Sequence, residues 1–329
     1  MYRYWLSKQM PVFKIAHVPG RGKGMIATED LKRGDPILFE FPLFILPLMP
    51  DETNDAEKDI ADKLRELSIE DRRKFFSLTN NFPKQKPFTG LVRTNAQPTD
   101  EQDDEVGIFE NAARMNHSCT PNANQYWDDD NQQLRVFATT DIKEGEEITI
   151  SYLPIYLWVL SREERQIVIK SYYEFECRCK ICTKPDAEIA KSDARRCKFA
   201  ELQEAKPVLI GNDHDSKALL YCKSMLKILE EEGDSDSKAV IIYHDASHIC
   251  LQNGEMARAK AFAKLAAEGY VEINGGDGKE EWEGDWKFML GQHHPMELKT
   301  GKWRKIGKEK NMRWKDDEGF EEWLWALAY

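Results

Sequence analysis

Short strand-like runs of mainly apolar residues recur in the amino-terminal half of the chain. Such runs, bounded by glycine-rich or charged turns, predict strands that bury one face. The expected strands are Val12–His17, Met25–Thr28, Pro36–Phe41, Ala123–Trp127, Leu134–Phe137 and Glu147–Ser151. The acidic cluster Asp128–Asn131 predicts a hairpin turn between two of them.

Helical periodicity interrupts this strand-rich half. Apolar residues recur at helical spacing over Asp55–Leu67 and again over Ile69–Leu78. Ser68 with Asp71 supplies a start signal for the second of these helices. The polar, proline-bearing stretch 83–107 that follows predicts a surface loop.

The pattern changes beyond about residue 186, where long amphipathic helices replace the short strands. A capping box at Ser161–Glu164 opens one helix that runs toward Tyr173. Three later helices are expected, at Lys217–Glu232, Lys238–Gln252 and Glu255–Val271. Such helices resemble a tetratricopeptide-like stack, although only one weak repeat unit is present. We therefore expect an α+β fold whose carboxy-terminal part is α-helical.

Tryptophan is concentrated near the end of the chain, since the last fifty residues hold six of the nine. Burial of these indoles in a small helical layer is the simpler explanation. An exposed docking surface is the alternative.

The net charge of the chain narrows the kinds of partner that it can bind. The 329 residues include 47 Lys and Arg against 58 Asp and Glu, which gives a formal net charge of −11. This balance argues against direct nucleic-acid binding and favours a basic protein or peptide as partner. The most apolar run, Phe39–Pro50, is too short and too rich in proline to span a membrane. The first twenty residues lack the apolar stretch of a secretory signal.

Three cysteines are crowded into Cys177–Cys182. Thiols at this spacing suit tetrahedral zinc, which takes four nitrogen or sulfur ligands in a structural site, and Cys119 is the natural candidate for the fourth. The odd total of seven cysteines argues against a disulfide framework and favours an intracellular compartment, cytoplasm or nucleus. The other thiols are expected in helical cores: Cys197, Cys222 and Cys250.

Two histidines, His244 and His248, lie four residues apart on an expected helix. This spacing suits a metal, but the glutamate that would follow the first histidine in a metalloprotease motif is missing. Histidines whose hydrogen bonds are satisfied within a helical layer are the favoured interpretation.

Alternating glycines mark Gly20–Gly24, between two expected strands. Glycines at such positions accept positive φ and let a backbone pass close to a ligand. The spacing matches neither a dinucleotide fingerprint nor a phosphate loop, so a plain basic turn is the simpler interpretation.

Small polar side chains are dense in Arg114–Asn122. They suit a loop in which Asn and Ser satisfy backbone groups locally. A nucleophilic pair of Cys119 and His117 is disfavoured, because residues two apart in an extended segment project side by side and no third orienting group is identifiable. Gly145–Tyr152 is a turn that leads into a strand ending in tyrosine.

In their order and spacing, these elements resemble the SET-domain protein-lysine methyltransferases. The resemblance is strongest to the SET-and-MYND (SMYD-like) branch and its fungal relatives without the finger, and it covers about Val12–Lys184. The N-H-S-C-x-P-N run, G-E-E-I-T-I-S-Y and C-x-C-x-x-C form a highly specific combination. The matching segments are Gly20–Gly24, Thr94–Ala96, Arg114–Asn122, Gly145–Tyr152, Ser161–Arg165 and Tyr173–Cys177.

The resemblance implies a methyltransferase of the SET type (class V) that uses S-adenosylmethionine to methylate lysine side chains of a protein, histone or non-histone. Tyr152 would be the catalytic tyrosine, and Phe175 would stack on the adenine. The cofactor site would comprise Arg21, Gly22, Lys23, Gly24, Asn95, Asn116, His117, Tyr152 and Phe175. One structural zinc would be held by Cys119, Cys177, Cys179 and Cys182. The alternative is a non-catalytic SET scaffold that serves as a protein-interaction module.

The implied architecture has three parts. A β-rich SET domain with a knot-like core would occupy residues 1–153, with a helical insertion at about 51–80. A zinc-binding post-SET segment would occupy 154–186, and a helical domain 187–329. Residues 51–88 contain neither cysteine nor histidine, so the MYND finger is absent and its partner contacts do not carry over. We expect a monomer.

Overall fold

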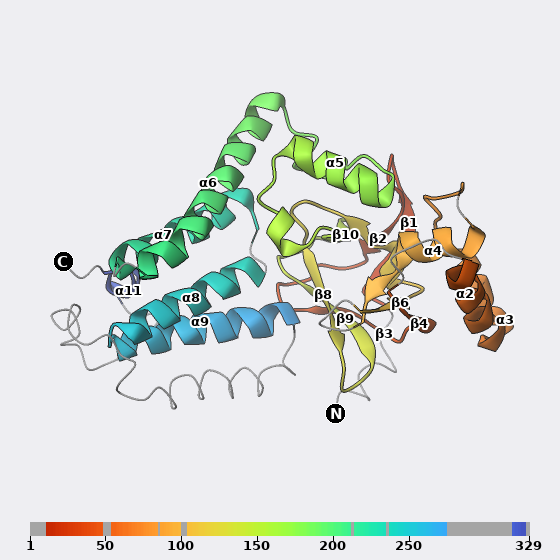
Figure 1. Cartoon of the computed structure of the whole chain (residues 1–329), viewed down its shortest axis with the longest axis horizontal. Helices are drawn as coiled ribbons and strands as arrows, with labels where there is room; N and C mark the ends of the chain where they lie inside the picture. The colour runs from red at the N-terminus through yellow and green to blue at the C-terminus, as the bar shows by residue number, and fades with distance from the viewer. Residues whose placement is uncertain are drawn as a thin grey trace. The chain divides into compact units, whose positions relative to one another are not determined.

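The computed structural model describes residues 11–48, 54–84, 86–99, 104–211, 214–234, 237–274 and 318–326. Two compact units make up the chain (Figure 1). Unit 1 comprises Met1–Leu153 and Glu163–Thr183, and unit 2 comprises Pro154–Arg162 and Lys184–Tyr329. The domain boundaries expected from the sequence stay a prediction.

Three small sheets form the framework of unit 1. The strands are β1 (Phe13–Val18), β2 (Gly22–Ala27), β3 (Pro36–Glu40), β4 (Phe44–Pro47), β5 (Gln97–Pro98), β6 (Glu105–Ile108), β7 (Asn116–His117), β8 (Ala123–Asp128), β9 (Gln133–Ala138) and β10 (Glu147–Ile150). Their orders are β1-β2-β10-β7, β3-β9-β8 and β4-β6-β5. Strand β10 runs antiparallel to β2 and parallel to β7.

The expected strands are confirmed, with ends that differ by a few residues. Met25, Leu134, Val136 and Ile148 point into a shared core, and β9 is buried along its whole length. The turn between β8 and β9 is confirmed as well, because the Asp128 carboxylate accepts a hydrogen bond from the Asn131 backbone at 3.0 Å.

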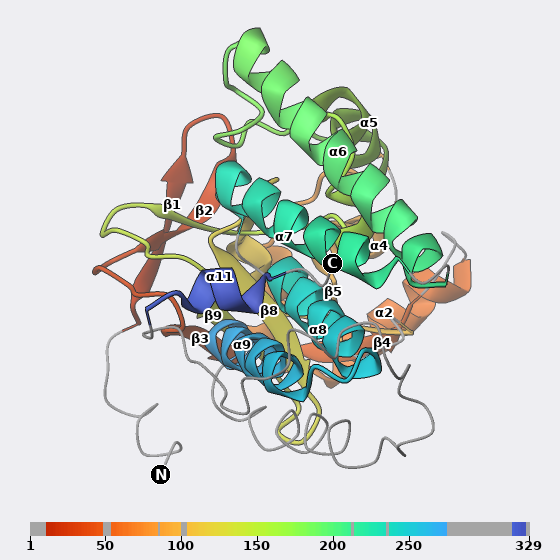
Figure 2. The same ribbon diagram turned by 90° about the vertical axis from the view of Figure 1, so that its left-hand side faces the viewer.

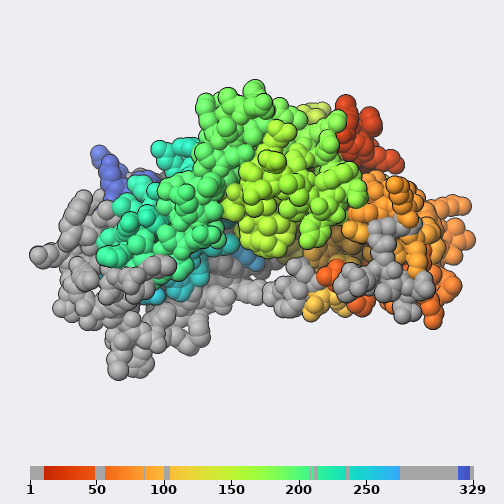
Figure 3. Space-filling model, turned by 45° about the horizontal axis from the view of Figure 1, so that its top comes forward, coloured from red at the N-terminus to blue at the C-terminus, as the bar shows by residue number. Residues whose placement is uncertain are grey.

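A helical insertion separates β4 from β5 and β6. Helices α2 (Asn54–Glu66) and α3 (Ile69–Phe76) occupy the predicted places, and the Ser68 side chain caps α3 by accepting from the Asp71 backbone at 3.0 Å. Phe75 and its apolar neighbours pack with β4 and β6 in a second core. The insertion forms the orange flank of unit 1 in Figure 3.

The surface loop predicted over 83–107 is wrong. This stretch contains helix α4 (Pro87–Asn95) and strands β5 and β6. Pro87 stands in the first turn of α4, where a missing N–H is harmless. Gly90 fits because a Cβ there would lie 2.8 Å from the Asn80 side chain and the Phe82 carbonyl. Proline and glycine are typical of loops, and for this reason the composition of the stretch did not predict helix α4.

Unit 2 is helical, as the sequence predicted for the carboxy-terminal part. Its α-helices in the described ranges are α6 (Asp186–Gly211), α7 (Asp215–Glu232), α8 (Ser237–Gln252), α9 (Met256–Asn274) and α11 (Phe320–Leu324). Helices α7, α8 and α9 lie side by side in sequence order (Figure 2), around a core that includes Leu219, Ile249 and Phe262. Helix α6 was not predicted individually, since its apolar residues do not follow one stripe and Pro207 lies inside it.

The individual predictions for unit 2 have mixed outcomes. Cys222 and Cys250 are buried as expected, but Cys197 is exposed, because α6 turns this position away from the core. Trp325 is buried and packs against Phe262 at a centroid distance of 4.8 Å, which fits the burial interpretation. Four of the six late tryptophans lie outside the described residues. No helix in the described ranges has the length and apolarity to cross a membrane.

Candidate active site and metal centre

The parallel pairing of β7 with β10 builds the centre of the site. It places Asn116 beside Thr149 and His117 beside Ile150. Asn122 holds the intervening loop, since its side chain accepts from the Thr149 backbone at 2.7 Å and donates to the Glu147 carbonyl at 2.9 Å. Asn122 therefore ties this segment to the distant strand β10. The local satisfaction expected from the composition holds for Ser118, whose hydroxyl accepts from the Thr120 backbone at 3.2 Å.

A cavity of about 510 Å³ opens in unit 1 beside these strands. The residues predicted for the cofactor site that line it are Arg21, Gly22, Lys23, Asn95, Asn116, His117, Tyr152 and Phe175. Gly24 does not line it. A Cβ at Gly24 would lie 2.7 Å from the Glu147 carboxylate and 3.0 Å from the Asn116 amide, so this glycine makes room for their contact instead.

The glycine-rich loop presents Arg21 to the site. Gly20 and Gly22 on either side have φ of +73° and +74°, a left-handed conformation that glycine adopts without strain. The Arg21 guanidinium donates to the Glu147 carboxylate and to the His117 carbonyl. Glu147 also accepts from the Asn116 amide at 2.7 Å. The loop is thus tied to both β7 and β10.

Asn95 reaches the cavity from the end of α4. Its amide nitrogen donates to the Thr79 and Leu91 carbonyls, both at 2.7 Å. Both amide hydrogens are used in this way, so the side-chain oxygen is the group that Asn95 offers to a ligand. An acceptor in this place suits a cationic or N–H-bearing group.

Tyr152 lies among other aromatic rings just beyond β10. Its hydroxyl donates to the Met115 carbonyl at 2.6 Å. Its ring centroid is 5.4 Å from that of His117 and 6.2 Å from that of Phe175. Burial raises the pKa of Tyr152, with a further contribution from the neighbouring Tyr173. The phenol is therefore neutral at physiological pH and does not act as a base.

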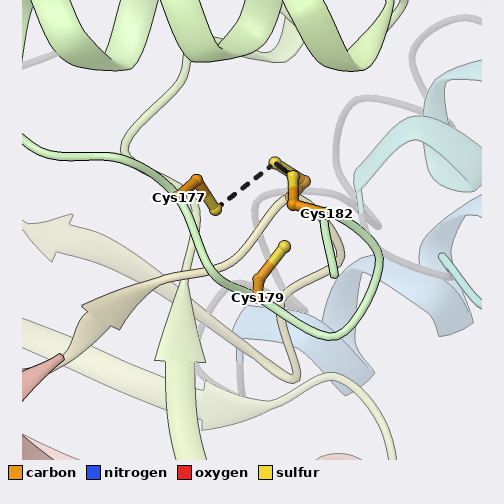
Figure 4. A group of neighbouring side chains, drawn as sticks. Cys177, Cys179 and Cys182 are labelled. Carbon is orange, nitrogen blue, oxygen red and sulfur yellow. Dashed lines mark hydrogen bonds between the residues drawn. The ribbon is translucent and has the colours of Figure 1, made fainter. Parts of the chain in front are cut away.

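Four cysteines converge on one buried point. The sulfur atoms of Cys119, Cys177, Cys179 and Cys182 lie within 4.8 Å of one another, and Figure 4 shows the three clustered in sequence pointing inward together. Cys119 Sγ is 3.9 Å from Cys177 Sγ and 3.6 Å from Cys182 Sγ. A tetrahedral zinc with 2.3 Å bonds separates its sulfurs by about 3.8 Å. The predicted cysteine set therefore fits a zinc ion.

Helix α5 (Arg162–Tyr173) supports the cysteine cluster through two consecutive residues. The Gln166 side chain donates to the Cys177 carbonyl at 2.8 Å and accepts from the Cys177 amide at 2.9 Å. Arg165 is buried and hydrogen-bonds the sulfurs of Cys119 and Cys182. A fixed positive charge beside the thiols favours the thiolate form in which cysteine binds metal.

His117 lies between the cysteine cluster and Tyr152. Its Nδ1 accepts from the Tyr152 backbone at 3.0 Å, and its Nε2 is 3.4 Å from Cys119 Sγ. The pKa of His117 is lowered to about 4, chiefly by burial, with Cys179 opposing the shift and the charges of Arg21 and Arg165 adding to it. The ring is therefore neutral.

Several residues of the cavity escaped the sequence analysis. Thr79 and Asn81 line it from the segment between α3 and α4, and Tyr173 lines it from the end of α5. Tyr173 stood within a motif but was assigned no role, whereas the small polar residues 79–81 resembled an ordinary loop. No periodicity marks residues that meet only through the tertiary fold.

The histidine pair of α8 forms no larger group of ligand-type residues. The rings of His244 and His248 lie 4.5 Å apart between centroids. Across the described ranges, the only cluster of three or more metal-binding side chains is the cysteine group.

Comparisons with known proteins agree with the geometry. Residues 22–153 match the SET domain family. The chain is 30% identical over 273 residues to histone-lysine N-methyltransferase set5 of Schizosaccharomyces pombe, which covers 82% of this chain and 81% of that protein.

Two further relatives match over shorter stretches. A SET domain-containing protein of Dictyostelium discoideum is 36% identical over 26% of this chain and 19% of its own. The protein-lysine N-trimethyltransferase SMYD5 of Mus musculus is 42% identical over 23% of this chain and 18% of its own. The breadth of the first match and the SET domain match together establish the family. The chain belongs to the SET-domain family of protein-lysine N-methyltransferases.

Proposed function

We propose that the protein uses S-adenosylmethionine to methylate lysine side chains of a basic protein substrate, with Tyr152 as the catalytic residue. The observation that carries this proposal is the convergence at one cavity of eight residues, from five segments of the sequence, that the family resemblance assigns to the cofactor site. A cavity of about 510 Å³ is within the usual size range for a bound cofactor.

The cavity residues suit the two ends of such a cofactor. Lys23 supplies a positive charge for a carboxylate, since the charge of Arg21 is paired with Glu147, and the Asn95 oxygen supplies an acceptor for an ammonium group. Phe175 provides an aromatic surface on which a purine can stack, and its ring lies 6.4 Å from the His117 ring.

Little chemistry is required of the protein itself. When bound, S-adenosylmethionine supplies a methyl group already activated by a positively charged sulfur. The protein has to hold a neutral lysine amine in line with that methyl group and to exclude water. Burial near positive charge lowers the pKa of an amine and so favours the reactive free base.

Tyr152 is suited to orienting the reactants. The Tyr152 hydroxyl donates its proton to the Met115 carbonyl. The lone pairs of the hydroxyl oxygen are therefore left to interact with other groups. The neighbouring Tyr173 hydroxyl donates to the Tyr152 carbonyl at 2.7 Å, which fixes the backbone of this residue. Oriented oxygen atoms of this kind stabilise developing positive charge, at about 3 kcal/mol for a well-placed group.

The substrate class rests on charge. A net charge of −11 favours lysine- and arginine-rich targets, and the S. pombe relative is named as a histone-lysine methyltransferase. We expect a histone or another basic intracellular protein as partner, in the cytoplasm or nucleus. A monomer without direct nucleic-acid contacts stays our prediction.

Replacing Tyr152 tests the proposed function directly. Tyr152→Phe removes one hydroxyl and should lower methyl transfer from radiolabelled S-adenosylmethionine to histones by about 100-fold or more. Because one buried hydrogen bond contributes about 1 kcal/mol, the variant should still fold. Tyr156→Phe is the matched control, since Tyr156 is 68% exposed.

Two outcomes would contradict the proposal. Equal transfer by wild type and Tyr152→Phe across basic substrates would remove Tyr152 from the reaction. Binding of S-adenosylmethionine in calorimetry without transfer to any substrate would favour the alternative of a non-catalytic interaction scaffold.

A further inference from the structure

The side chain of His117 makes two hydrogen bonds that point in different directions. Its Nδ1 lies 3.0 Å from the Tyr152 backbone nitrogen, which is always a donor. A neutral imidazole that accepts at Nδ1 carries its proton on Nε2. Nε2 is 3.4 Å from Cys119 Sγ, so the ring donates to this sulfur. The side chain is 2% exposed, and solvent does not compete for either bond.

The sulfur that accepts this bond belongs to the predicted zinc site. Four thiolates around one Zn²⁺ leave a charge of −2, which buried N–H donors offset. Arg165 provides one donor to Cys119 and Cys182, and His117 provides another to Cys119. Groups that hydrogen-bond metal ligands hold those ligands in orientation. Cys119 is therefore held both from α5 and from the active-site side.

The other bond of His117 reaches the backbone of the expected catalytic residue. Three hydrogen bonds hold Tyr152: its amide donates to His117, its hydroxyl donates to Met115, and its carbonyl accepts from Tyr173. The carbonyl bond ties Tyr152 to Tyr173, which lines the cavity, and the hydroxyl bond ties it to the buried Met115. The amide bond ties it to the cysteine cluster.

We propose that His117 is a positioning residue that couples the zinc ligand Cys119 to the catalytic Tyr152. Metal binding orients Cys119, Cys119 orients the imidazole ring, and the ring fixes the backbone of Tyr152. The inference rests on the proposed function, because it gives Tyr152 its catalytic role. Since coupling between two sites is reciprocal, filling the cavity also changes the environment of the Cys119 thiolate.

Two substitutions separate the two bonds. The amide of asparagine reaches about as far as Nδ1, so His117→Asn retains an acceptor for Tyr152 and loses the donor to Cys119. The amide of glutamine reaches about as far as Nε2, so His117→Gln retains the donor and loses the acceptor. Both variants and the full-length wild type are prepared with zinc and, separately, with Co²⁺, whose thiolate charge-transfer band reports on the metal-bound sulfurs.

The coupling predicts different defects for the two variants. His117→Asn should bind zinc about 10-fold to 100-fold more weakly in a chelator competition, and its cobalt band should move to longer wavelength. His117→Gln should retain the zinc affinity and band position of the wild type, while its kcat falls by up to about 100-fold. In the wild-type cobalt protein, S-adenosylhomocysteine should shift the band, and both variants should lose this shift.

The matched control is His17→Asn, at an exposed position of β1, which should retain the wild-type zinc affinity and band. A wild-type zinc affinity in His117→Asn, or equal zinc loss in both His117 variants, would overturn the coupling. If His117→Asn fails to fold, the wild-type titration decides, since a band that S-adenosylhomocysteine leaves unshifted overturns the inference. Failure of the proposed function is distinguishable, because it appears as absent methyl transfer by the wild type.

Discussion

The buried polar side chains of the two units have different roles. In unit 1, His117, Arg165 and Asn95 are almost fully buried, and each points at the cavity or at the cysteine cluster. In unit 2, the buried Glu232 accepts from Arg195 and Arg196, which joins α7 to α6. These buried polar groups therefore line a site in the first unit and fasten helices together in the second.

This difference indicates what each unit depends on for stability. Unit 1 has small sheets and carries its last segment, Glu163–Thr183, against residues far away in sequence. A bound metal would hold that segment in place. Unit 2 relies on apolar helix packing around residues such as Leu219 and Phe262. Substitutions that act on one unit and spare the other can test this contrast.

The largest effect is expected from loss of a cysteine ligand. Cys179→Ser should abolish tight zinc binding, which contributes about 10–16 kcal/mol in small zinc domains. Elemental analysis should find about one zinc per chain in the wild type and far less in the variant. Hydrogen exchange should increase in Glu163–Thr183 and stay unchanged in unit 2. Cys197→Ser, at an exposed thiol, is the control. A wild-type protein that contains no zinc but is fully protected from hydrogen exchange in Glu163–Thr183 would contradict the assignment of the four cysteines to zinc.

A smaller effect, confined to unit 2, is expected from a core truncation. Phe262 is fully buried and contacts Trp325 and Tyr243. Phe262→Ala should lower the free energy of unfolding of unit 2 by about 3–5 kcal/mol, through lost burial and the cavity left behind. Zinc content should not change. A variant that loses zinc together with helical protection would show that the two units are not energetically separate.

The smallest effect concerns the insertion. Glu57 accepts hydrogen bonds from Phe88 and Thr89 at the start of α4, with the Thr89 backbone at 2.9 Å. Burial opposes ionisation of Glu57, but hydrogen bonds from Thr89 and Phe88 outweigh it and lower its pKa. Because the folded-state pKa lies below the unfolded value of about 4.3, this stabilisation is complete above pH 4.3 and is lost as the pH falls further.

Glu57→Gln tests this helix cap. It should destabilise the insertion by about 1 kcal/mol at neutral pH, and the difference from wild type should shrink in acid. Denaturant unfolding at pH 7 and below pH 4 measures both quantities. Asp59→Asn, an exposed acid on the same helix, is the control, and a pH-independent deficit would indicate a steric origin instead.

Local signals were sufficient for much of the fold and failed where tertiary context decides. Strands near Pro36 and Ala123 and helices such as α7 follow from residue periodicity. Helix α4 did not, because Pro87 and Gly90 resemble loop residues until their partners are known.

The expected cofactor residues were named through the family resemblance and the expected metal ligands through cysteine spacing, and the fold brings most of these residues together. Thr79 and Asn81 could not be named, since residues aligned only by tertiary packing carry no local pattern. Gly24 belongs to a motif but does not line the cavity. Its lack of a side chain leaves room for the contact between Glu147 and Asn116.

The cysteine cluster also has a consequence for biosynthesis. Cys119 meets partners that lie 58 and 63 positions later in the chain. At usual translation rates of about 5–20 residues per second, a nascent chain waits roughly 3–13 seconds between the emergence of the first thiol and the last. For most of that interval the ribosome-bound protein lacks Phe175 and has an incomplete cavity. Zinc supply at the moment of synthesis would then govern how many newly made molecules assemble the four-cysteine cluster.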